Sequence, residues 1–362
     1  MKTIISKRMK TAIKFGQKLA RKGEGRPFLV MYFFAKDNNA HDRGFFLNEK
    51  QIVDDCFSTL LPTTYDLYLP YELDGNSNLD TALKHIAINK VYIGVDNVNN
   101  NGVANIFSSR NVEIIRGIEG EAARRFNEVY LYNEQTNKPF IALSFGMSID
   151  GKIATKTGDS RYISGPQARA LVHKLRDRYQ AILVGINTVR VDHPRLTARL
   201  RGKVALDPIR VVLDSRLSIA LDEPILHLDS KAKTIIVALK NVDLAKKQAL
   251  LDLGAIVLEV EEEQGHVSLV DTIAKLYELG IDSIFVEGGA TIHFAFISQN
   301  LFNIIYAYIS PIIIGGITSP SAVGGEGFAY LKDATNVEFS ATKRLGRDIV
   351  MTMRPLKKGS NK

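Results

Sequence analysis

The chain has 362 residues, of which 45% are hydrophobic and 24% are charged, and its formal net charge is +8. These proportions are ordinary for a soluble globular protein, and the length predicts two domains. No run of about eighteen apolar residues occurs in the sequence, so we expect no membrane span. The single cysteine, Cys56, excludes an internal disulfide and a thiolate zinc cluster, and it favours a reducing cytoplasm.

Lysines and arginines are scattered along the chain, except near its two ends. A phosphorylated substrate and a phosphorylated cofactor account for the positive charge as well as a nucleic acid does, and we expect no nucleic-acid partner. Residues 1–25 are basic and lack an apolar signal core. They fit a helix that opens the first domain, with an organelle transit peptide as the alternative.

Helical and strand patterns alternate over the first 135 residues. The expected helices cover residues 9–21, 49–60 and 78–88, and the expected strands cover residues 28–34, 64–69, 90–95 and 112–115. This alternation predicts an α/β domain with a mainly parallel sheet. Residues 121–140 then fit a linking helix and a connection into a second domain.

Residues 139–199 form the most informative stretch of the chain. An apolar strand over residues 139–145 and a sharp turn over residues 146–151 are followed by a polar loop that ends in Ser164-Gly165-Pro166. This tripeptide is expected to begin an amphipathic helix over residues 166–179. A second apolar strand, residues 181–186, leads into another polar loop. The order predicts a βαβ unit, in which ligands bind beyond the carboxyl ends of the strands.

The remaining sequence continues the α/β pattern. The expected strands cover residues 209–213, 234–239, 255–260, 284–286, 303–314 and 347–353, and the expected helices cover residues 242–253 and 269–279. We expect Gly254 and Gly280 to end these two helices and Ser268 to cap the second. Gly288 and Gly289 separate a strand from a helix, an arrangement that lets the backbone approach a phosphate. A tight turn without a ligand is the alternative for this pair.

Seven segments occur in the order typical of one known family: MSIDGKIAT, GDSRYISG, ARALVHKLR, AILVGINTV with VDHPRLT, DPIRVVLDS, FVEGGATIHFAF and YISPIIIGG. Over about residues 139–354 the chain resembles the reductase domain of the bifunctional riboflavin-biosynthesis deaminase/reductase, and its free-standing archaeal and fungal counterparts. That domain is similar in fold to dihydrofolate reductase. We therefore expect a dihydrofolate-reductase-like α/β domain over residues 139–358.

Residues 1–135 resemble a cytidine-deaminase-like α/β domain in the order and spacing of their elements. Deaminases of this kind hold zinc with one His or Cys and two Cys, and a glutamate beside the first ligand transfers protons. The corresponding positions here are Phe46, Asn48, Tyr71 and Leu79, and none of them suits these roles. The resemblance therefore implies a degenerate deaminase domain without a metal, and a separate deaminase elsewhere in the pathway.

The resemblance implies reduction of a ring-opened ribosylamino-pyrimidine phosphate to its ribitylamino form, with NADPH as cofactor. The expected catalytic residues are Lys152, Asp192 and Glu287. Each has an ordinary alternative: a solvated lysine, a loop-capping aspartate, and an acid that complements a helix dipole. Many relatives have a second acid at the position of His193, for which we favour a structural role.

Further site residues are carried over from the family. Those expected to bind substrate are Ser160, Arg176, Leu196 and Arg199, the arginines being suited to phosphate. For Arg176, a surface ion pair is the alternative. Those expected to bind NADPH are Gly146, Tyr162, Thr188, Ser215, Gly288, Gly289, Ala290 and Thr291.

Several functions remain open from the sequence. The substrate is 5-amino-6-(5-phosphoribosylamino)uracil or, if reduction precedes deamination, the 2,5-diamino-pyrimidinone phosphate. A non-catalytic binding or scaffold protein and a generic pterin reductase are weaker readings, because the candidate catalytic residues and the family loops are intact. We also expect a cytoplasmic homodimer, since the apolar strand at 304–314 would be exposed if it lay at an open sheet edge.

Overall fold

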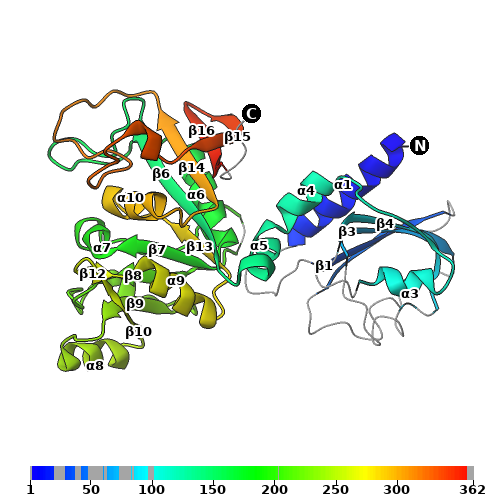
Figure 1. Cartoon of the computed structure of the whole chain (residues 1–362), viewed down its shortest axis with the longest axis horizontal. Coiled ribbons are helices and arrows are strands. Elements are labelled where there is room, and N and C mark those ends of the chain that lie inside the picture. The colour runs from blue at the N-terminus through cyan, green and yellow to red at the C-terminus, as the bar shows by residue number, and fades with distance from the viewer. Residues whose placement is uncertain are drawn as a thin grey trace. The chain divides into compact units, whose positions relative to one another are not determined.

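The computed structural model describes residues 2–19, 29–36, 42–47, 60, 63–72, 83, 85–96, 102–202 and 204–356 (Figure 1). The chain divides into two compact units, Met1–Asn137 and Lys138–Lys362. Each unit has its own sheet and its own hydrophobic core. None of the described helices is long and apolar enough to cross a membrane.

The sheet of the first unit has the strand order β2-β1-β3-β4-β5. Its strands are β1 (Leu29–Ala35), β2 (Arg43–Leu47), β3 (Thr64–Tyr71), β4 (Ala87–Val95) and β5 (Glu113–Ile115). β3, β4 and β5 are parallel, whereas β1 is antiparallel to both β2 and β3. The prediction of a mainly parallel sheet was therefore wrong. The connection from β1 to β2 spans residues 36–42, which is too short for the crossover that a parallel pair needs.

Helices of the first unit cover its sheet (Figure 1). They are α1 (Lys2–Leu19), α3 (Ala104–Ser108), α4 (Gly120–Phe126) and α5 (Glu128–Thr136). α1 is longer than expected, and it buries Met9, Ala12 and Ile13, which recur at helical spacing, in the core of this unit. Gly16 permits close packing of α1, because a Cβ there would lie 2.5 Å from the Phe126 ring.

Two other predictions for this unit concern residues outside the described ranges. The helix expected at 49–60 is described only at residue 60, and most of the helix expected at 78–88 is also undescribed. The last two residues of the latter range belong to β4, so that helix was predicted too long.

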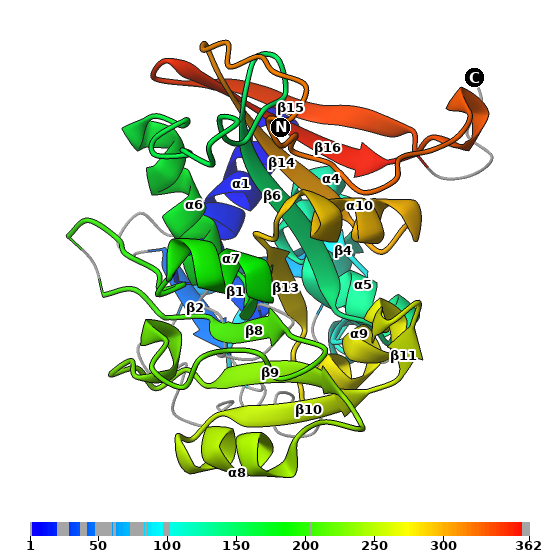
Figure 2. The same ribbon diagram turned by 90° about the vertical axis from the view of Figure 1, so that its left-hand side faces the viewer.

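The second unit contains a nine-stranded sheet with the order β10-β9-β8-β7-β13-β6-β14-β16-β15 (Figure 2). Its strands are β6 (Phe140–Ser148), β7 (Ala181–Gly185), β8 (Ile209–Leu213), β9 (Thr234–Leu239), β10 (Ile256–Val260), β13 (Ser283–Val286), β14 (Ile304–Ser310), β15 (Val337–Leu345) and β16 (Asp348–Pro355). The strands from β10 to β14 are all parallel, and β16 and β15 complete the sheet in antiparallel fashion. This arrangement confirms the α/β fold class.

The strand expected at 303–314 ends at Ser310, because Pro311 has no N–H to donate to a ladder. β14 pairs with β6 on one side and with β16 on the other. It is therefore an interior strand, and the open-edge argument for a dimer was wrong. β15, which the sequence analysis missed, forms the edge instead of the strand expected at 347–353. Its side chains are mostly exposed and several are charged, which is typical of an edge strand.

Helices cover both faces of this sheet (Figure 2). They are α6 (Pro166–Arg178), α7 (Ile186–Asp192), α8 (Leu244–Asp252), α9 (Leu269–Glu278) and α10 (Ala290–Ser298). Buried residues of α7 and α8 belong to one core cluster, and those of α9 and α10 belong to another. Ser268 caps α9, and Gly254 and Gly280 have the positive φ expected after a helix.

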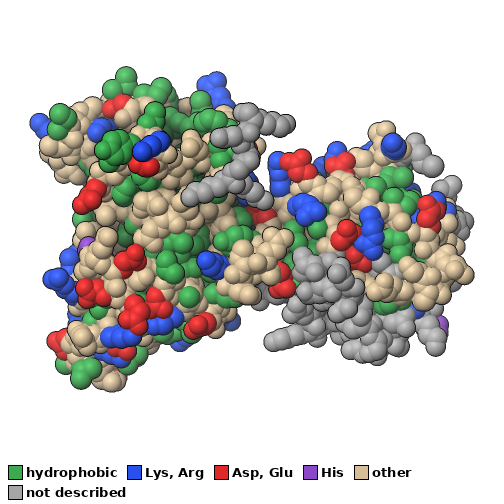
Figure 3. Space-filling view, in the orientation of Figure 1, with side chains coloured by type: hydrophobic (Ala, Val, Ile, Leu, Met, Phe, Trp, Pro, Cys, Tyr) green, Lys and Arg blue, Asp and Glu red, His purple; other side chains and the backbone are tan. Residues whose placement is uncertain are grey.

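Two local predictions need correction. Gly165, not Ser164, is the N-cap of α6, although Pro166 does begin the helix. The polar loop expected after β7 starts with the short helix α7, which buries Val189 beneath the polar residues of its outer face. A hairpin of β11 (Glu262–Glu263) and β12 (His266–Val267) was also missed. On the face of the second unit in Figure 3, described Lys and Arg side chains lie among Asp and Glu side chains.

Candidate active site

The three expected catalytic residues follow three neighbouring strands at one edge of the large sheet. Lys152 follows β6, Asp192 ends the helix after β7, and Glu287 comes directly after β13. β13 lies between β7 and β6, and all three strands are parallel. Their carboxyl ends therefore meet at the same edge, as the βαβ reading predicts.

Arg176 and Glu287 form a two-bond ion pair at the centre of this edge. Arg176 Nε donates to Glu287 Oε1 at 2.7 Å, and Arg176 Nη2 donates to Oε2 at 2.6 Å. Arg176 Nη1 donates to the Thr197 carbonyl at 3.1 Å. The two side chains are only 14% and 17% exposed, so the pair is largely shielded from water. Arg176 thus orients Glu287, a contact that the sequence analysis did not foresee.

His173 lies beside this pair and was missed by the sequence analysis. It precedes Arg176 by three residues on α6, a spacing that places both side chains on one face of the helix. Burial, together with the nearby guanidinium groups of Arg176 and Arg199, lowers the pKa of His173 below its usual value. His173 Nδ1 is buried without a hydrogen-bond partner in the described structure. The imidazole is therefore neutral at pH 7. The helical spacing to Arg176 was the signal available in the sequence.

The turn after β6 holds Lys152 against the segment that follows β14. Lys152 Nζ donates to the Ser319 carbonyl at 3.0 Å, and the Lys152 N–H donates to Ser148 Oγ at 2.8 Å. Asp150 accepts from the Ile314 and Gly315 N–H groups at 3.1 and 2.7 Å. The pKa of Asp150 is lowered to about 2 by hydrogen bonds from the Ser148 hydroxyl and these two backbone groups. Gly146 to Ser148 still belong to β6, so the turn begins later than expected.

Asp192 and His193 have different environments at the end of α7. The Asp192 carboxylate is exposed and makes no hydrogen bond or ion pair within the described part of the chain. His193 Nδ1 lies 3.0 Å from the buried Glu223 carboxylate, a geometry that supports the structural role favoured for it. Leu196 is buried in the left-handed conformation at φ 50°, and Arg199 is exposed.

The Gly288–Gly289 pair connects β13 to α10, and only Gly288 lacks space for a side chain. A Cβ at Gly288 would lie 2.6 Å from Ile292, and one at Gly289 would lie 3.9 Å from the Thr188 hydroxyl. Gly289 is the N-cap of α10, and among the described residues no side chain caps this helix. Backbone N–H groups of Ala290 and the next residues can therefore receive an anion.

The other expected ligand residues are distributed around this edge. Tyr162 is 70% exposed, and the Arg169 guanidinium lies 4.5 Å from its ring centroid. Ser160 is exposed in the same loop, and a Cβ at Gly146 would lie 3.7 Å from Ser164, just before α6. The structure thus brings the site residues that follow β6, β7 and β13 to one edge of the sheet. Ser215 lies farther along this edge, after β8.

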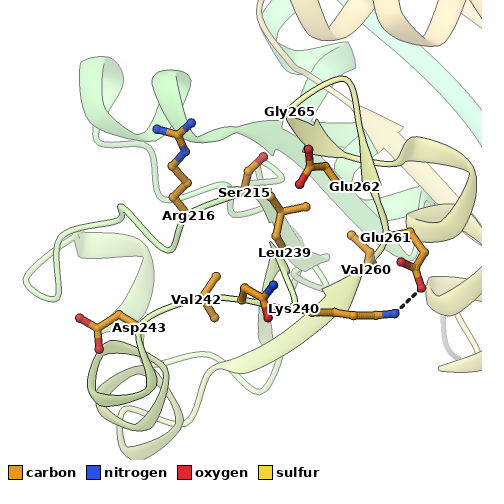
Figure 4. Close-up of a pocket in the computed structure, with 11 residues that line it drawn as sticks. Ser215, Arg216, Leu239, Lys240, Val242, Asp243, Val260, Glu261, Glu262 and Gly265 are labelled. Atoms are coloured by element: carbon orange, nitrogen blue, oxygen red, sulfur yellow. Dashed lines mark hydrogen bonds and ion pairs between the residues drawn. The ribbon is translucent and has the colours of Figure 1, made fainter.

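Ser215 lines a pocket beyond the carboxyl ends of β8, β9 and β10 (Figure 4). The pocket has a volume of about 560 Å³. Its lining residues come from the segments after these three strands and are Ser215, Arg216, Leu239, Lys240, Asn241, Val242, Asp243, Val260, Glu261, Glu262 and Gly265. Except for Ser215, the sequence analysis missed them, because each segment is an ordinary polar loop when read alone.

Comparison with known proteins places the chain in a family. The model of the RibD C-terminal domain matches residues 139–351, which is more than half of the chain. The riboflavin biosynthesis protein RibD of Bacillus amyloliquefaciens is 36% identical over 272 residues, which cover 74% of this chain and 72% of that protein. The 2,5-diamino-6-ribosylamino-4(3H)-pyrimidinone 5′-phosphate reductase of Methanothermobacter thermautotrophicus is 33% identical over 216 residues, or 59% of this chain and 97% of that protein.

Solved structures share the fold of each unit. The deaminase/reductase of Thermotoga maritima superposes with a TM-score of 0.82 at 21% identity, covering 98% of this chain and 99% of that one. Form 2 of RibD from Acinetobacter baumannii gives a TM-score of 0.81 at 22% identity, covering 98% and 99% of the two chains. These structures confirm the fold of both units. Together with the matched domain and the sequence relatives, they confirm the resemblance: the chain belongs to the RibD family of riboflavin-biosynthesis proteins.

Proposed function

We propose that the chain reduces 5-amino-6-(5-phosphoribosylamino)uracil to its ribitylamino form with NADPH, and that its first unit has lost deaminase activity. The family supports a pyrimidine reductase of the riboflavin pathway. The observation that carries the proposal is the polar edge of the second unit. There Lys152, Asp192 and Glu287 come after parallel strands, and Arg176 of α6 pairs with Glu287, all inside the segment that matches the reductase domain.

The chain fits a nicotinamide dinucleotide through the features around Gly288. Two glycines and the uncapped start of α10 leave backbone N–H groups for its phosphates, and Thr188 lies beside them. When bound, NADPH supplies a hydride to the imine carbon of the ring-opened substrate. We also assign Gly146 and Tyr162 to the cofactor, and Ser160 to the substrate.

The catalytic residues orient the substrate and supply charge. Both Glu287 oxygens accept from Arg176, and each retains acceptor capacity for a sugar hydroxyl. Lys152 follows β6 at the same edge of the sheet, and its Nζ donates to the Ser319 carbonyl. The unpartnered Asp192 carboxylate can accept or transfer a proton without first breaking an ion pair.

We assign the substrate phosphate to the part of this edge that carries Arg176 and Arg199. Arg199 is exposed, and its charge, like that of Arg176, lowers the pKa of the His173 imidazole. An incoming phosphate would meet this positive region. Arg176 then has two roles, because it fixes Glu287 and contributes charge for the phosphate. Leu196, whose backbone precedes Thr197, helps to shape this loop.

A reductase that acts before deamination is the second candidate. The Methanothermobacter relative is named for the 2,5-diamino substrate, and the match covers 97% of its length. The two substrates differ at one exocyclic group of the pyrimidine. A non-catalytic scaffold is the remaining alternative, and the candidate catalytic residues argue against it. Nothing in the described geometry favours a pterin reductase.

Loss of deamination is proposed from the first unit. Phe46 occupies β2 and Tyr71 is a buried residue of β3, while Asn48 and Leu79 lie outside the described residues. Neither Phe nor Tyr can replace a zinc ligand or a proton-transferring glutamate. A separate cytoplasmic deaminase would then supply the uracil substrate. Zinc near one equivalent in the purified chain, bound by the first unit, would contradict this part of the proposal.

The decisive experiment measures NADPH oxidation by the full chain with each of the two pyrimidine phosphates. We expect turnover with the uracil form, and faster turnover with the diamino form would favour the second candidate. The Asp192→Asn variant serves as the inactive control, since it keeps the shape of the side chain and removes its charge. Failure of the wild-type chain to oxidise NADPH with either compound would refute the reductase.

A further inference from the structure

We propose that Arg347, in the turn between β15 and β16, is a positioning residue for the reduction. It holds the loop of residues 158–165, which carries Ser160 and Tyr162. This inference rests on the proposed function, which assigns Ser160 to the substrate and Tyr162 to the cofactor. It adds a residue from the last strand pair of the chain, and this residue acts through the loop instead of on either ligand.

The turn between β15 and β16 lies beside the start of α6 (Figure 2). Gly346 in this turn has a φ of 62°, and a Cβ there would lie 2.7 Å from the Gln167 side chain of α6. The turn therefore packs directly on the first residues of the helix. The loop of residues 158–165 ends where this helix begins, so the turn is also next to the loop.

The Arg347 guanidinium holds the backbone of the loop. Its Nη2 donates to the Ile163 carbonyl at 2.8 Å and to the Tyr162 carbonyl at 3.4 Å. A second arginine, Arg169 of α6, lies over the Tyr162 ring and donates from Nη1 to the Ser164 carbonyl. The backbone on both sides of Ile163 is thus fixed, while the Tyr162 ring stays 70% exposed and available to stack on a ligand.

Asp348, the first residue of β16, anchors the turn that carries Arg347. Its carboxylate is fully buried, and Oδ2 accepts from the Gly165 N–H at 2.6 Å while Oδ1 accepts from the Ser310 hydroxyl at 2.9 Å. The carboxylate lies at the start of α6, where the helix dipole favours a negative charge. A Cβ at Gly165 would lie 2.9 Å from Oδ2, so this close approach requires glycine.

The same anchor connects the loop to the other side of the proposed site. Ser310 of β14 is the register partner of Ser148 of β6. Ser148 Oγ accepts from the Lys152 N–H at 2.8 Å. Ser148, Ser310 and Asp348 are all fully buried, and a satisfied buried network of this kind is rigid. The turn therefore fixes the loop relative to the strand end that carries Lys152.

An ordinary stabilising contact of the hairpin is the competing explanation for Arg347. The same hairpin provides a matched control, because Arg344 of β15 is also exposed and donates to the Gly346 carbonyl at 3.1 Å. That bond stays within the turn, whereas the bonds of Arg347 join residues 184 and 185 positions apart. Loss of Arg344 removes the same charge and leaves the bonds to the loop in place.

The test measures NADPH binding to the full chain by fluorescence titration without pyrimidine, and hydrogen exchange of the loop amides by mass spectrometry. Arg347→Met should weaken NADPH binding by roughly tenfold, the effect of one hydrogen bond from a charged group. It should also speed exchange over residues 158–165. Arg344→Met should change NADPH binding by less than about twofold, because it touches only the turn.

Steady-state kinetics and a double variant separate positioning from general packing. Arg347→Met should raise KM for NADPH and change kcat by less than about threefold, because uniform binding is lost while the catalytic residues stay in place. Tyr162→Ala removes the ring and keeps the carbonyl that Arg347 contacts. In that background Arg347→Met should weaken NADPH binding by less than about threefold, since the positioned ring is gone.

Three outcomes would overturn the proposal: unchanged loop exchange or NADPH affinity in Arg347→Met, equal effects of Arg347→Met and Arg344→Met, or effects of Arg347→Met and Tyr162→Ala that simply multiply. The Arg347 side chain is 49% exposed, so the variant should fold, with the circular dichroism of the wild type. A wild-type chain that binds NADPH but reduces neither pyrimidine would refute the reduction alone. Turnover by the wild type without an Arg347 effect would refute the positioning role alone.

Discussion

The Arg176–Glu287 pair makes the strongest quantitative prediction, because it links stability to catalysis. The Glu287→Gln variant keeps the size of the side chain but removes the charge that Glu287 places against the Arg176 guanidinium. Removing one partner of a buried pair costs about 3–5 kcal/mol. Both side chains retain some exposure, and glutamine keeps one acceptor oxygen, so we expect a loss near the lower value. NADPH oxidation should also fall by about 10²–10⁴-fold.

Further variants distinguish the loss of the Arg176–Glu287 interaction from the loss of a single charge elsewhere in the site. Arg176→Met should destabilise the chain similarly, since it leaves the Glu287 carboxylate unpaired. The double variant Arg176→Met with Glu287→Gln should lose less stability than the sum of the single losses, because no buried charge is left alone. Asp192→Asn is the matched control. It should reduce the rate by a similar factor and change the free energy of unfolding by less than about 0.5 kcal/mol, because Asp192 is exposed.

The measurements are urea titrations followed by circular dichroism and initial rates with saturating NADPH. Additive losses in the double variant would show that the two side chains do not interact in solution as they do in the structure. Equal stability of Glu287→Gln and Asp192→Asn would lead to the same conclusion. If Glu287→Gln is destabilised but fully active, the pair is purely structural and the catalytic assignment is wrong.

Two other predictions concern the second unit. A fragment of residues 138–362 should fold and keep the reductase activity, and a folded but inert fragment would show that the first unit completes the site. Because the folded-state pKa of Asp150 is lowered from 3.8 to about 2, the contribution of its carboxylate is present above pH 3.8 and lost as the pH falls toward 2. Asp150→Asn should therefore be less stable than the wild type at pH 7 in thermal melts, and this difference should shrink as the pH falls from 4 toward 2; a constant difference would contradict this account.

The sequence predicts the buried parallel strands well because their composition reflects their environment. β7 and β8 are covered on both faces by helices, and their apolar runs stand out from the polar segments around them. The edge strand β15 has mostly exposed side chains and little apolar character, so the same criterion missed it. α7 was missed for a related reason, since a seven-residue helix with one buried residue has almost no periodic signal.

The order of the catalytic residues along the chain also predicts where they meet, but not how they pair. The direction of parallel strands brings the residues that follow them to one edge of the sheet, and this does not depend on which side chains those residues have. The Arg176–Glu287 contact joins residues 111 positions apart and depends on β13 lying between β7 and β6. No local sequence pattern predicts that β13 lies between β7 and β6, because β8, β9 and β10 come between β7 and β13 in the sequence.

β13 positions two parts of the proposed site, the carboxylate of Glu287 and the glycine pair. β13 ends just before Glu287 and the glycine pair, so the substrate orientation and the phosphate binding that we propose both depend on the position of this four-residue strand. Its register with β6 and β7 fixes where Glu287 meets Arg176 on α6, and α10 follows at once. Because Arg176 joins α6 to the end of β13, the ion pair holds this segment at the edge as well as orienting a carboxylate. Loss of the pair should therefore weaken cofactor binding along with substrate reduction, whereas loss of Asp192 should leave cofactor binding unchanged.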